Sequence, residues 1–304
     1  MLENLTNCPV CEHDYFSPFL VCKDYTVSEK EFQIVACQNC DFKFTNPRPS
    51  AEEIGKYYHS DNYISHSNTK KGILAQIYQK VRKISLQAKL KHIQKESQLE
   101  KGSILDYGCG TGNFLKICQE NNWEVTGIEP EEIARKQAED LLKINIKENI
   151  FETELKTKSF DVITLWHVLE HIHLLDETIE KLRELLKPNG ILLIAVPNCA
   201  SADAKKWKEY WAAYDVPRHL YHFTPQTLPL LLKKHSIKID KYMAMPYDSY
   251  YISLLSRKYK TGKLNFLNGF FDGLQSNQWA KKNSLNFSSV LYVCSCNIAN
   301  FPKV

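Results

Sequence analysis

The feature that most constrains this chain is a glycine-rich turn between a strand-like run and a helical one. The apolar run SILDYG leads into Asp106-Tyr-Gly-Cys-Gly-Thr-Gly112, and the helical pattern NFLKICQEN follows directly. Gly108, Gly110 and Gly112 let the backbone turn sharply and approach a ligand, while the helix N-terminus behind them favours negative charge. The turn therefore predicts a ligand site at the end of the first strand of an α/β domain.

Strand-like and helical runs alternate from Ser103 onward, as in βαβ units. This alternation predicts a doubly wound α/β fold with a seven-stranded, mostly parallel sheet. The strand candidates are SILDYG, WEVTGIEP, KINIKEN, FDVITLWHV, GILLIAVPN, IKIDKYMAM and FSSVLYVCSCN.

Two Cys-x-x-Cys pairs precede this domain. Cys8 and Cys11 form the first pair, Cys37 and Cys40 form the second, and 25 residues separate the pairs. Each pair can turn both sulfurs toward one tetrahedral ion, and the alternating apolar residues between them predict a β-hairpin. We expect a structural zinc ion held by four thiolates, which would supply much of the stability of so small a unit.

The predicted organisation has three parts. Residues 1–48 form the zinc ribbon, residues 49–101 form a helical linker with a long helix from about 72 to 97, and residues 102–304 form the α/β domain. The segment from about 246 to 283 is expected to be a helical insertion before the last strand. Its aromatic side chains fit either a substrate pocket or a dimer contact.

Composition narrows the class of protein. Hydrophobic residues make up 43% of the 304, so a substantial core is expected, and the net charge of +4 lacks the clustered pattern of a nucleic-acid binder. The N-terminus has no signal-peptide pattern, and no apolar run is long enough to cross a membrane. We expect a cytoplasmic protein that acts on a small molecule; the sequence leaves its oligomeric state open.

Glu129 ends the second strand-like run, 17 residues beyond Gly112. An acidic side chain in this place can accept hydrogen bonds from both hydroxyls of a ribose. A nicotinamide enzyme would have the spacing G-x-G-x-x-G, but this chain has G-x-G-x-G and places Asn113 where the third glycine would fall. The spacing argues against hydride transfer.

These motifs resemble those of the class I S-adenosylmethionine-dependent methyltransferases, in which an acidic-x-G-x-G-x-G turn is followed by an acidic residue closing the second strand. The resemblance continues through FDVITLWHVLEHI, LLKPNGILLIAVPN and DVPRHLYHFTP. VLEH and LLKPNG are similar to the ubiquinone-biosynthesis and small-molecule O- or C-methyltransferase group. The resemblance implies the sheet order of that fold and an antiparallel last strand.

The same resemblance implies which residues bind the cofactor, S-adenosylmethionine. Asp106 and the glycine turn would hold its methionine end, and Glu129 would hold its ribose. Residues after the third and fourth strands would flank the adenine and the sulfonium; by position these are Asn149 and Ile150, and Trp166 and His167.

Methyl transfer needs an aligned acceptor and, for many acceptors, a base that removes a proton. Candidate bases follow two strands at their carboxyl ends, where open α/β sheets bind ligands. The hypothesis names His219, His171 and His222 as catalytic residues, although His171 can equally be a structural loop histidine. Arg218 can pair with an anionic substrate or with Asp215. An aromatic stripe just before this segment fits either a lid or a core: Trp207, Tyr210, Trp211 and Tyr214.

Two other functions compete with methylation of a small metabolite. A zinc ribbon beside a methyltransferase domain is also similar to ribosomal-RNA base methyltransferases, but Leu165-Trp-His-Val168 lacks the Asn/Asp-Pro-Pro-aromatic turn of those enzymes. A non-catalytic module that binds a partner through the ribbon is the other alternative. The intact glycine and acidic positions argue against it.

Overall fold

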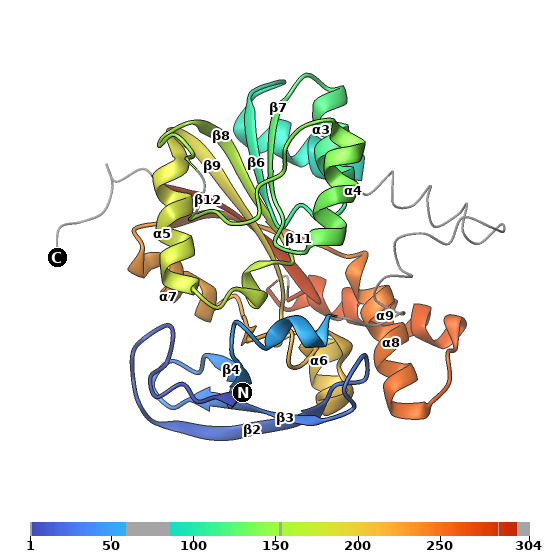
Figure 1. The fold of residues 1–304 in the computed structure, drawn as a ribbon. Coiled ribbons are helices and arrows are strands. Elements are labelled where there is room, and N and C mark those ends of the chain that lie inside the picture. Colours follow the sequence, from blue (N-terminus) through green and yellow to red (C-terminus); the bar gives the residue numbers. More distant parts are fainter. Residues whose placement is uncertain (1, 59–85, 152–153, 285, 297–304) are drawn as a thin grey trace.

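A six-stranded sheet forms the centre of the molecule (Figure 1). The computed structural model describes residues 2–58, 86–151, 154–284 and 286–296. The strand order is β11-β12-β9-β8-β6-β7. The strands are β6 (Ser103–Tyr107), β7 (Glu124–Ile128), β8 (Phe160–Trp166), β9 (Leu186–Pro197), β11 (Lys238–Ala244) and β12 (Ser289–Ser295). The last strand, β12, pairs antiparallel with both β11 and β9, and the other pairings are parallel, so the predicted doubly wound, mostly parallel fold with an antiparallel last strand is confirmed.

Helices cover both faces of this sheet (Figure 1). On one face, α5 (Leu175–Leu185) and α7 (Thr227–Lys234) pack into one apolar cluster. On the other, α3 (Asn113–Glu120), α4 (Glu132–Leu142) and a helix over 86–97 pack into a second. Because both faces are covered, the central strands are near-continuous apolar runs instead of alternating ones.

The predicted strand KINIKEN, at 143–149, is corrected by the structure. Lys143 adopts a left-handed conformation (φ 58°) at the end of α4, and the segment then makes a single isolated bridge, between Ile128 and Lys147. Two backbone hydrogen bonds hold it, from Lys147 N–H to Gly127 O and from Glu129 N–H to Lys147 O. The segment lies beyond the edge strand β7 and pairs over too short a length to extend the sheet.

The N-terminal unit contains the predicted hairpin. Strands β2 (Phe16–Lys23) and β3 (Glu31–Cys37) pair antiparallel, and β3 pairs with β4 (Lys43–Thr45). The fourth strand of this sheet comes from far along the chain, because β10 (Tyr221–His222) pairs with β4. A short pairing of β1 (Leu2–Glu3) with β5 (Arg48–Pro49) completes the unit. The N-terminal sheet and the α/β domain are therefore joined by strand pairing; the boundary at residue 48 stays a prediction.

The aromatic stripe before β10 is core. Three of its rings are buried, and they pack against side chains of the hairpin in one apolar cluster: Trp207, Trp211 and Tyr214. The chain here runs through α6 (Ala202–Trp207) and short 3₁₀ turns. The sequence left open whether this stripe is a lid or core. In the structure its buried rings pack between the two units, as core.

Arg218 ties the two units together. Its guanidinium is 1% exposed, bonds both carboxylate oxygens of Asp215 at 3.0 and 2.6 Å, and reaches Asp24 Oδ1 at 3.1 Å. A fourth hydrogen bond goes to the carbonyl of Tyr57 at 2.9 Å. Asp24 lies in the turn between β2 and β3, where it also accepts hydrogen bonds from the backbone N–H groups of residues 26–28.

Two expected helical regions are partly or wholly described. The helix predicted over 72–97 is present from residue 86, and residues 72–85 lie outside the described residues. Helices α8 (Asp248–Thr261) and α9 (Phe266–Lys282) occupy the predicted insertion between β11 and β12. Among the helices of the described residues, none is both long and apolar enough to cross a membrane.

We expect Arg218→Ala to lower the free energy of unfolding by about 3–5 kcal/mol, because it leaves the fully buried carboxylate of Asp24 without its cation. Urea unfolding followed by tryptophan fluorescence measures this loss. Arg183→Ala is the matched control, since the ion pair of Arg183 with Glu180 on α5 is partly exposed and should contribute about 1 kcal/mol or less. Equal losses for the two variants would contradict the role given to Arg218.

Candidate functional site

The glycine turn lies between β6 and α3. Gly108, Gly110 and Gly112 all have positive φ, at 75°, 54° and 75°. A side chain at Gly108 would clash with Val168, whose Cγ2 lies 2.5 Å from the position of a Cβ, and one at Gly112 would press on α4. At Gly110 a Cβ would meet nothing within 4 Å. Gly110 therefore leaves open space above the turn, as a ligand site requires.

Glu129 points at this turn. Its Oε2 accepts a hydrogen bond from Gly110 N–H at 2.7 Å, and its Oε1 accepts one from Glu131 N–H at 3.0 Å. The side chain is 9% exposed, and burial raises its pKa despite these two bonds. The end of β7 thus places a carboxylate against the middle glycine, where the sequence predicted a ribose contact.

Asp106 lies beside the same turn, near the carboxyl end of β6. Its carboxylate is almost fully buried and accepts a hydrogen bond from Thr164 Oγ1 at 2.6 Å. Burial raises the pKa of Asp106 to about 7, and the nearby carboxylate of Glu129 acts in the same direction. Two buried acidic groups close together favour a cationic ligand, because a cation would restore their ionised forms.

Trp166 and His167 follow at the end of β8. The Trp166 ring meets Phe114 of α3 edge to face at 5.7 Å, and the Lys89 ammonium lies 4.2 Å from its centroid. Its indole N–H is buried and has no hydrogen-bond partner in the described part of the chain. His167 Nε2 lies 3.1 Å from Asp248 Oδ2. Burial lowers the pKa of His167, but its contacts with Asp248 and Glu170 outweigh this and raise it to about 9.

A cluster of one carboxylate and two imidazoles lies just beyond His167. Glu170 is fully buried, with His167 Nδ1 at 3.7 Å and His219 Nε2 at 4.0 Å from its Oε1. The rings of His171 and His219 meet edge to face at 4.6 Å. One ligand atom from each of Glu170, His171 and His219 lies within 4.8 Å of the other two. The geometry thus brings together two of the three histidines predicted to be catalytic.

A hydrogen bond to a carbonyl group fixes the tautomer of His219. Its Nδ1 lies 2.9 Å from Ala213 O, and because a carbonyl oxygen can only accept, Nδ1 carries the proton and Nε2 carries the lone pair of the neutral ring. His171 Nδ1 lies 2.9 Å from both Arg218 O and the Tyr58 hydroxyl. Burial lowers the pKa of His171 to about 4, so this ring stays neutral. The cluster therefore presents proton acceptors, and it has the chemistry to take up a proton or a cation.

His222, the third predicted base, lies elsewhere. Its Nε2 is 3.2 Å from Thr45 Oγ1, and that hydroxyl donates to His219 O at 2.8 Å. The hydroxyl has one proton, so His222 donates from Nε2 and helps to hold β10 against β4. Burial lowers the pKa of His222 well below its ordinary value. The structure does not bring its ring into the Glu170 cluster.

Two contacts near the candidate site were not predicted from the sequence. Asp248, the first residue of α8, faces His167 across the end of the sheet, and Asp24 from the hairpin turn completes the surroundings of Arg218. Neither aspartate belongs to a motif, because each reaches the site through the fold. Of the two partners considered for Arg218, the observed one is Asp215.

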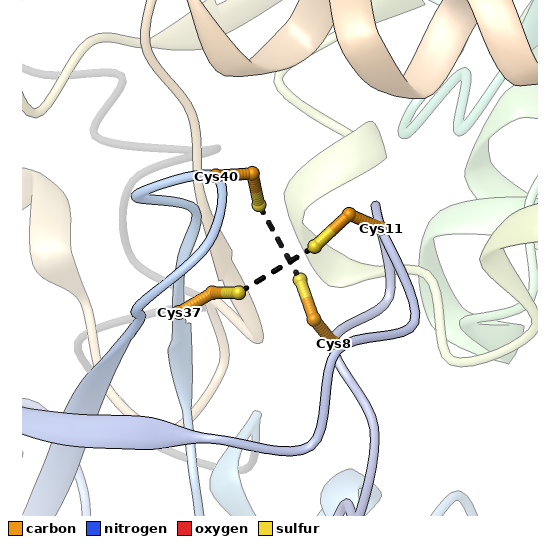
Figure 2. Close-up of side chains that lie close together, drawn as sticks. All are labelled: Cys8, Cys11, Cys37 and Cys40. Carbon is orange, nitrogen blue, oxygen red and sulfur yellow. Dashed lines mark hydrogen bonds between the residues drawn. The ribbon is translucent and has the colours of Figure 1, made fainter.

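The four cysteines of the N-terminal unit converge from two turns (Figure 2). The sulfurs of Cys8 and Cys40 are 3.6 Å apart, and those of Cys11 and Cys37 are 3.5 Å apart. A tetrahedral zinc ion with bonds of about 2.3 Å would separate its sulfur ligands by about 3.8 Å. The four-thiol donor set and its spacing fit a closed zinc site.

Comparisons with known proteins agree with this geometry. A family model described as a methyltransferase domain matches residues 78–240. The ubiquinone biosynthesis O-methyltransferase of Histophilus somni is 34% identical over 122 residues, which are 36% of this chain and 51% of that protein. The enzyme of the same description from Nitrosococcus oceani is 29% identical over 189 residues, 58% of this chain and 78% of the relative. This chain thus covers about half the length of the Histophilus relative.

Among solved structures, the geranyl diphosphate C-methyltransferase of Streptomyces coelicolor A3(2) superposes with a TM-score of 0.50 at 9% sequence identity. The match covers 75% of this chain and 86% of that one, and it supports the fold. Since the family model spans more than half of the 304 residues, the chain belongs to the methyltransferase-domain family, as its resemblance to the S-adenosylmethionine-dependent enzymes predicted.

Proposed function

We propose that this chain transfers a methyl group from S-adenosylmethionine to an oxygen or carbon atom of a small metabolite, such as a sugar nucleotide or a quinone-like or lipid-linked compound. The observation that carries the proposal is the buried carboxylate of Glu129 against the open backbone of Gly110. A carboxylate in this position can accept hydrogen bonds from a ribose, and the open side of the turn admits the rest of the cofactor.

The charges of the site suit this cofactor. S-adenosylmethionine carries a positive sulfonium and a positive ammonium group, and it supplies the methyl group that is transferred. Asp106 and Glu129 are buried carboxylates with raised pKa values, so a cationic ligand would stabilise their ionised forms. We assign Asp106, Gly108, Gly110, Gly112 and Glu129 to cofactor binding, with Trp166 and His167 beside them.

His219 is the proposed general base. Its proton on Nδ1 is held by Ala213 O, which leaves Nε2 to accept a proton from the substrate. Glu170, 4.0 Å from Nε2, would stabilise the imidazolium that results. His171 lies beside this ring, but its pKa of about 4 makes it a weak proton acceptor near neutral pH. Its assigned role is to hold the His219 ring by edge-to-face contact.

The four cysteines are proposed to hold a structural zinc ion. All four donors are thiols, so the site has no open coordination position for chemistry. The ion would instead stabilise the sheet formed by β2, β3, β4 and β10, which lies next to the His219 segment.

Glu129→Gln should weaken binding of S-adenosylhomocysteine about 10- to 100-fold, because the hydrogen bonds of a charged group contribute about 1.5–3 kcal/mol. Isothermal titration calorimetry measures the change. Glu132→Gln is the control, since Glu132 lies in the first turn of α4 and pairs with Lys136 at the surface. If Glu129→Gln and the wild type bind equally, Glu129 is not part of the site.

His219→Ala should reduce turnover about 10²- to 10⁴-fold while leaving cofactor affinity unchanged, because it removes a base and no cofactor contact. Turnover is followed by mass spectrometry of metabolite extracts supplied with methyl-deuterated cofactor. His235→Ala is the control, because His235 at the end of α7 contacts Asp176 outside the cluster. Unchanged turnover with His219→Ala would rule out this base.

Cys37→Ser should reduce bound zinc from about one ion per chain to near zero and lower the melting temperature, because metal binding contributes to folding. Elemental mass spectrometry of the purified protein gives the metal content. Cys22→Ser, which alters a buried thiol of the same hairpin outside the four, should keep its zinc. Zinc retained in full by Cys37→Ser would contradict the assignment.

A further inference from the structure

The hairpin of α8 and α9 ends in an exposed apolar tip. Five large side chains there are between 51% and 74% exposed: Leu264, Phe266, Leu267, Phe270 and Phe271. Every residue from 260 to 268 is exposed, and the rings of Phe270 and Phe271 meet edge to face with their centroids 5.9 Å apart. The hairpin lies at the outer edge of the molecule, away from the central sheet (Figure 1). Exposed apolar surface gathered in this way is typical of an interaction site.

The two helices of the hairpin pack closely together. A Cβ at Gly269 would lie 2.9 Å from Leu254 Cα, and one at Gly273 would lie 2.8 Å from Tyr250 Cα. These two glycines, four residues apart on α9, let the backbones of the two helices approach closely. Arg257 of α8 also donates two hydrogen bonds to the carboxylate of Asp272 on α9, at 2.8 and 2.6 Å. The apolar side chains are therefore presented by two closely packed helices.

The charged residues that the hairpin itself carries near its tip are basic. Lys258, Lys260 and Lys263 are exposed beside the apolar side chains. Between Asp248 and Asp272 the sequence contains no aspartate or glutamate. A surface that combines aromatic and aliphatic side chains with lysines matches the interface of an anionic lipid bilayer, where apolar groups enter the acyl boundary and cations meet the headgroups.

We infer that the tip of the α8–α9 hairpin, defined by Lys258, Lys260, Lys263 and the five apolar side chains, docks the protein on an anionic membrane surface. Phe266 and Leu267 insert at the headgroup level, and the lysines pair with lipid phosphates. The docking is peripheral. It requires neither cofactor nor substrate, so it stands apart from the proposed methyl transfer.

A second copy of the chain fits this surface less well. A symmetric dimer would bring the same lysines toward one another, with no acidic side chain between 249 and 271 to neutralise them. An anionic membrane supplies the opposite charge directly. The charge pattern therefore selects the membrane as the partner.

The test is co-sedimentation of the full chain with vesicles of phosphatidylcholine alone or with about one third phosphatidylglycerol. We expect binding to the anionic vesicles only, weakened by added salt. Lys258→Glu/Lys263→Glu should weaken it about 25-fold or more, since each cation near an anionic surface strengthens binding about fivefold. Phe266→Ser/Leu267→Ser should abolish the part of the vesicle binding that persists at high salt.

Matched control variants make the same kinds of substitution away from the tip. Leu174→Ser/Leu230→Ser removes two comparably exposed apolar side chains, and Lys91→Glu/Lys233→Glu reverses two exposed lysines on other helices. Both should bind as the wild type does. Absence of binding to anionic vesicles, or equal loss in tip and control variants, overturns the inference. A second outcome also overturns it. The wild type would fail to bind vesicles and would form a dimer in analytical ultracentrifugation, and Phe266→Ser/Leu267→Ser would dissociate that dimer.

Discussion

The buried guanidinium of Arg218 is the interaction on which the arrangement of this protein depends. It joins Asp24 in the hairpin of the N-terminal unit to Asp215 in the segment that precedes β10. A buried ion pair is stable only when its geometry and hydrogen bonds are nearly complete, and the carbonyl of Tyr57 provides a further acceptor here. The neighbouring residue is His219, so the same contacts that join the two units also position the proposed base.

This connection brings the N-terminal unit next to the His219 segment. The pairing of β10 with β4 and the hydrogen bond from Thr45 to His219 O place N-terminal backbone and side chains directly behind the His219 segment. The glycine turn approaches the same region from the other side, since Val168 packs on Gly108 two residues before Glu170. The short segment after β8, from Val168 to Glu170, thus lies between the proposed cofactor site and the proposed base. The α/β domain holds the cofactor site, and contacts with the N-terminal unit hold the base.

Much of the fold followed from local patterns. The alternation of strand-like and helical runs predicted the parallel sheet, and the alternating apolar residues between the two cysteine pairs predicted the hairpin, because these signals depend on residues near one another in the chain. The same reasoning failed for KINIKEN, whose apolar residues fit a strand, because strand formation there depends on pairing length at a sheet edge. Local pattern also left the stripe that contains Trp211 undecided, since a core and a lid have the same spacing.

The sequence by itself determined the glycine turn, the acidic residue that closes β7 and the two cysteine pairs, because each is a short motif whose geometry is local. Only the tertiary structure decided that His171 and His219 meet at Glu170 while His222 faces Thr45. It also decided that Asp248 faces His167, and that the aromatic end of α9 remains exposed. These contacts join residues far apart in the chain, and their distances depend on how whole elements pack, which no local pattern encodes.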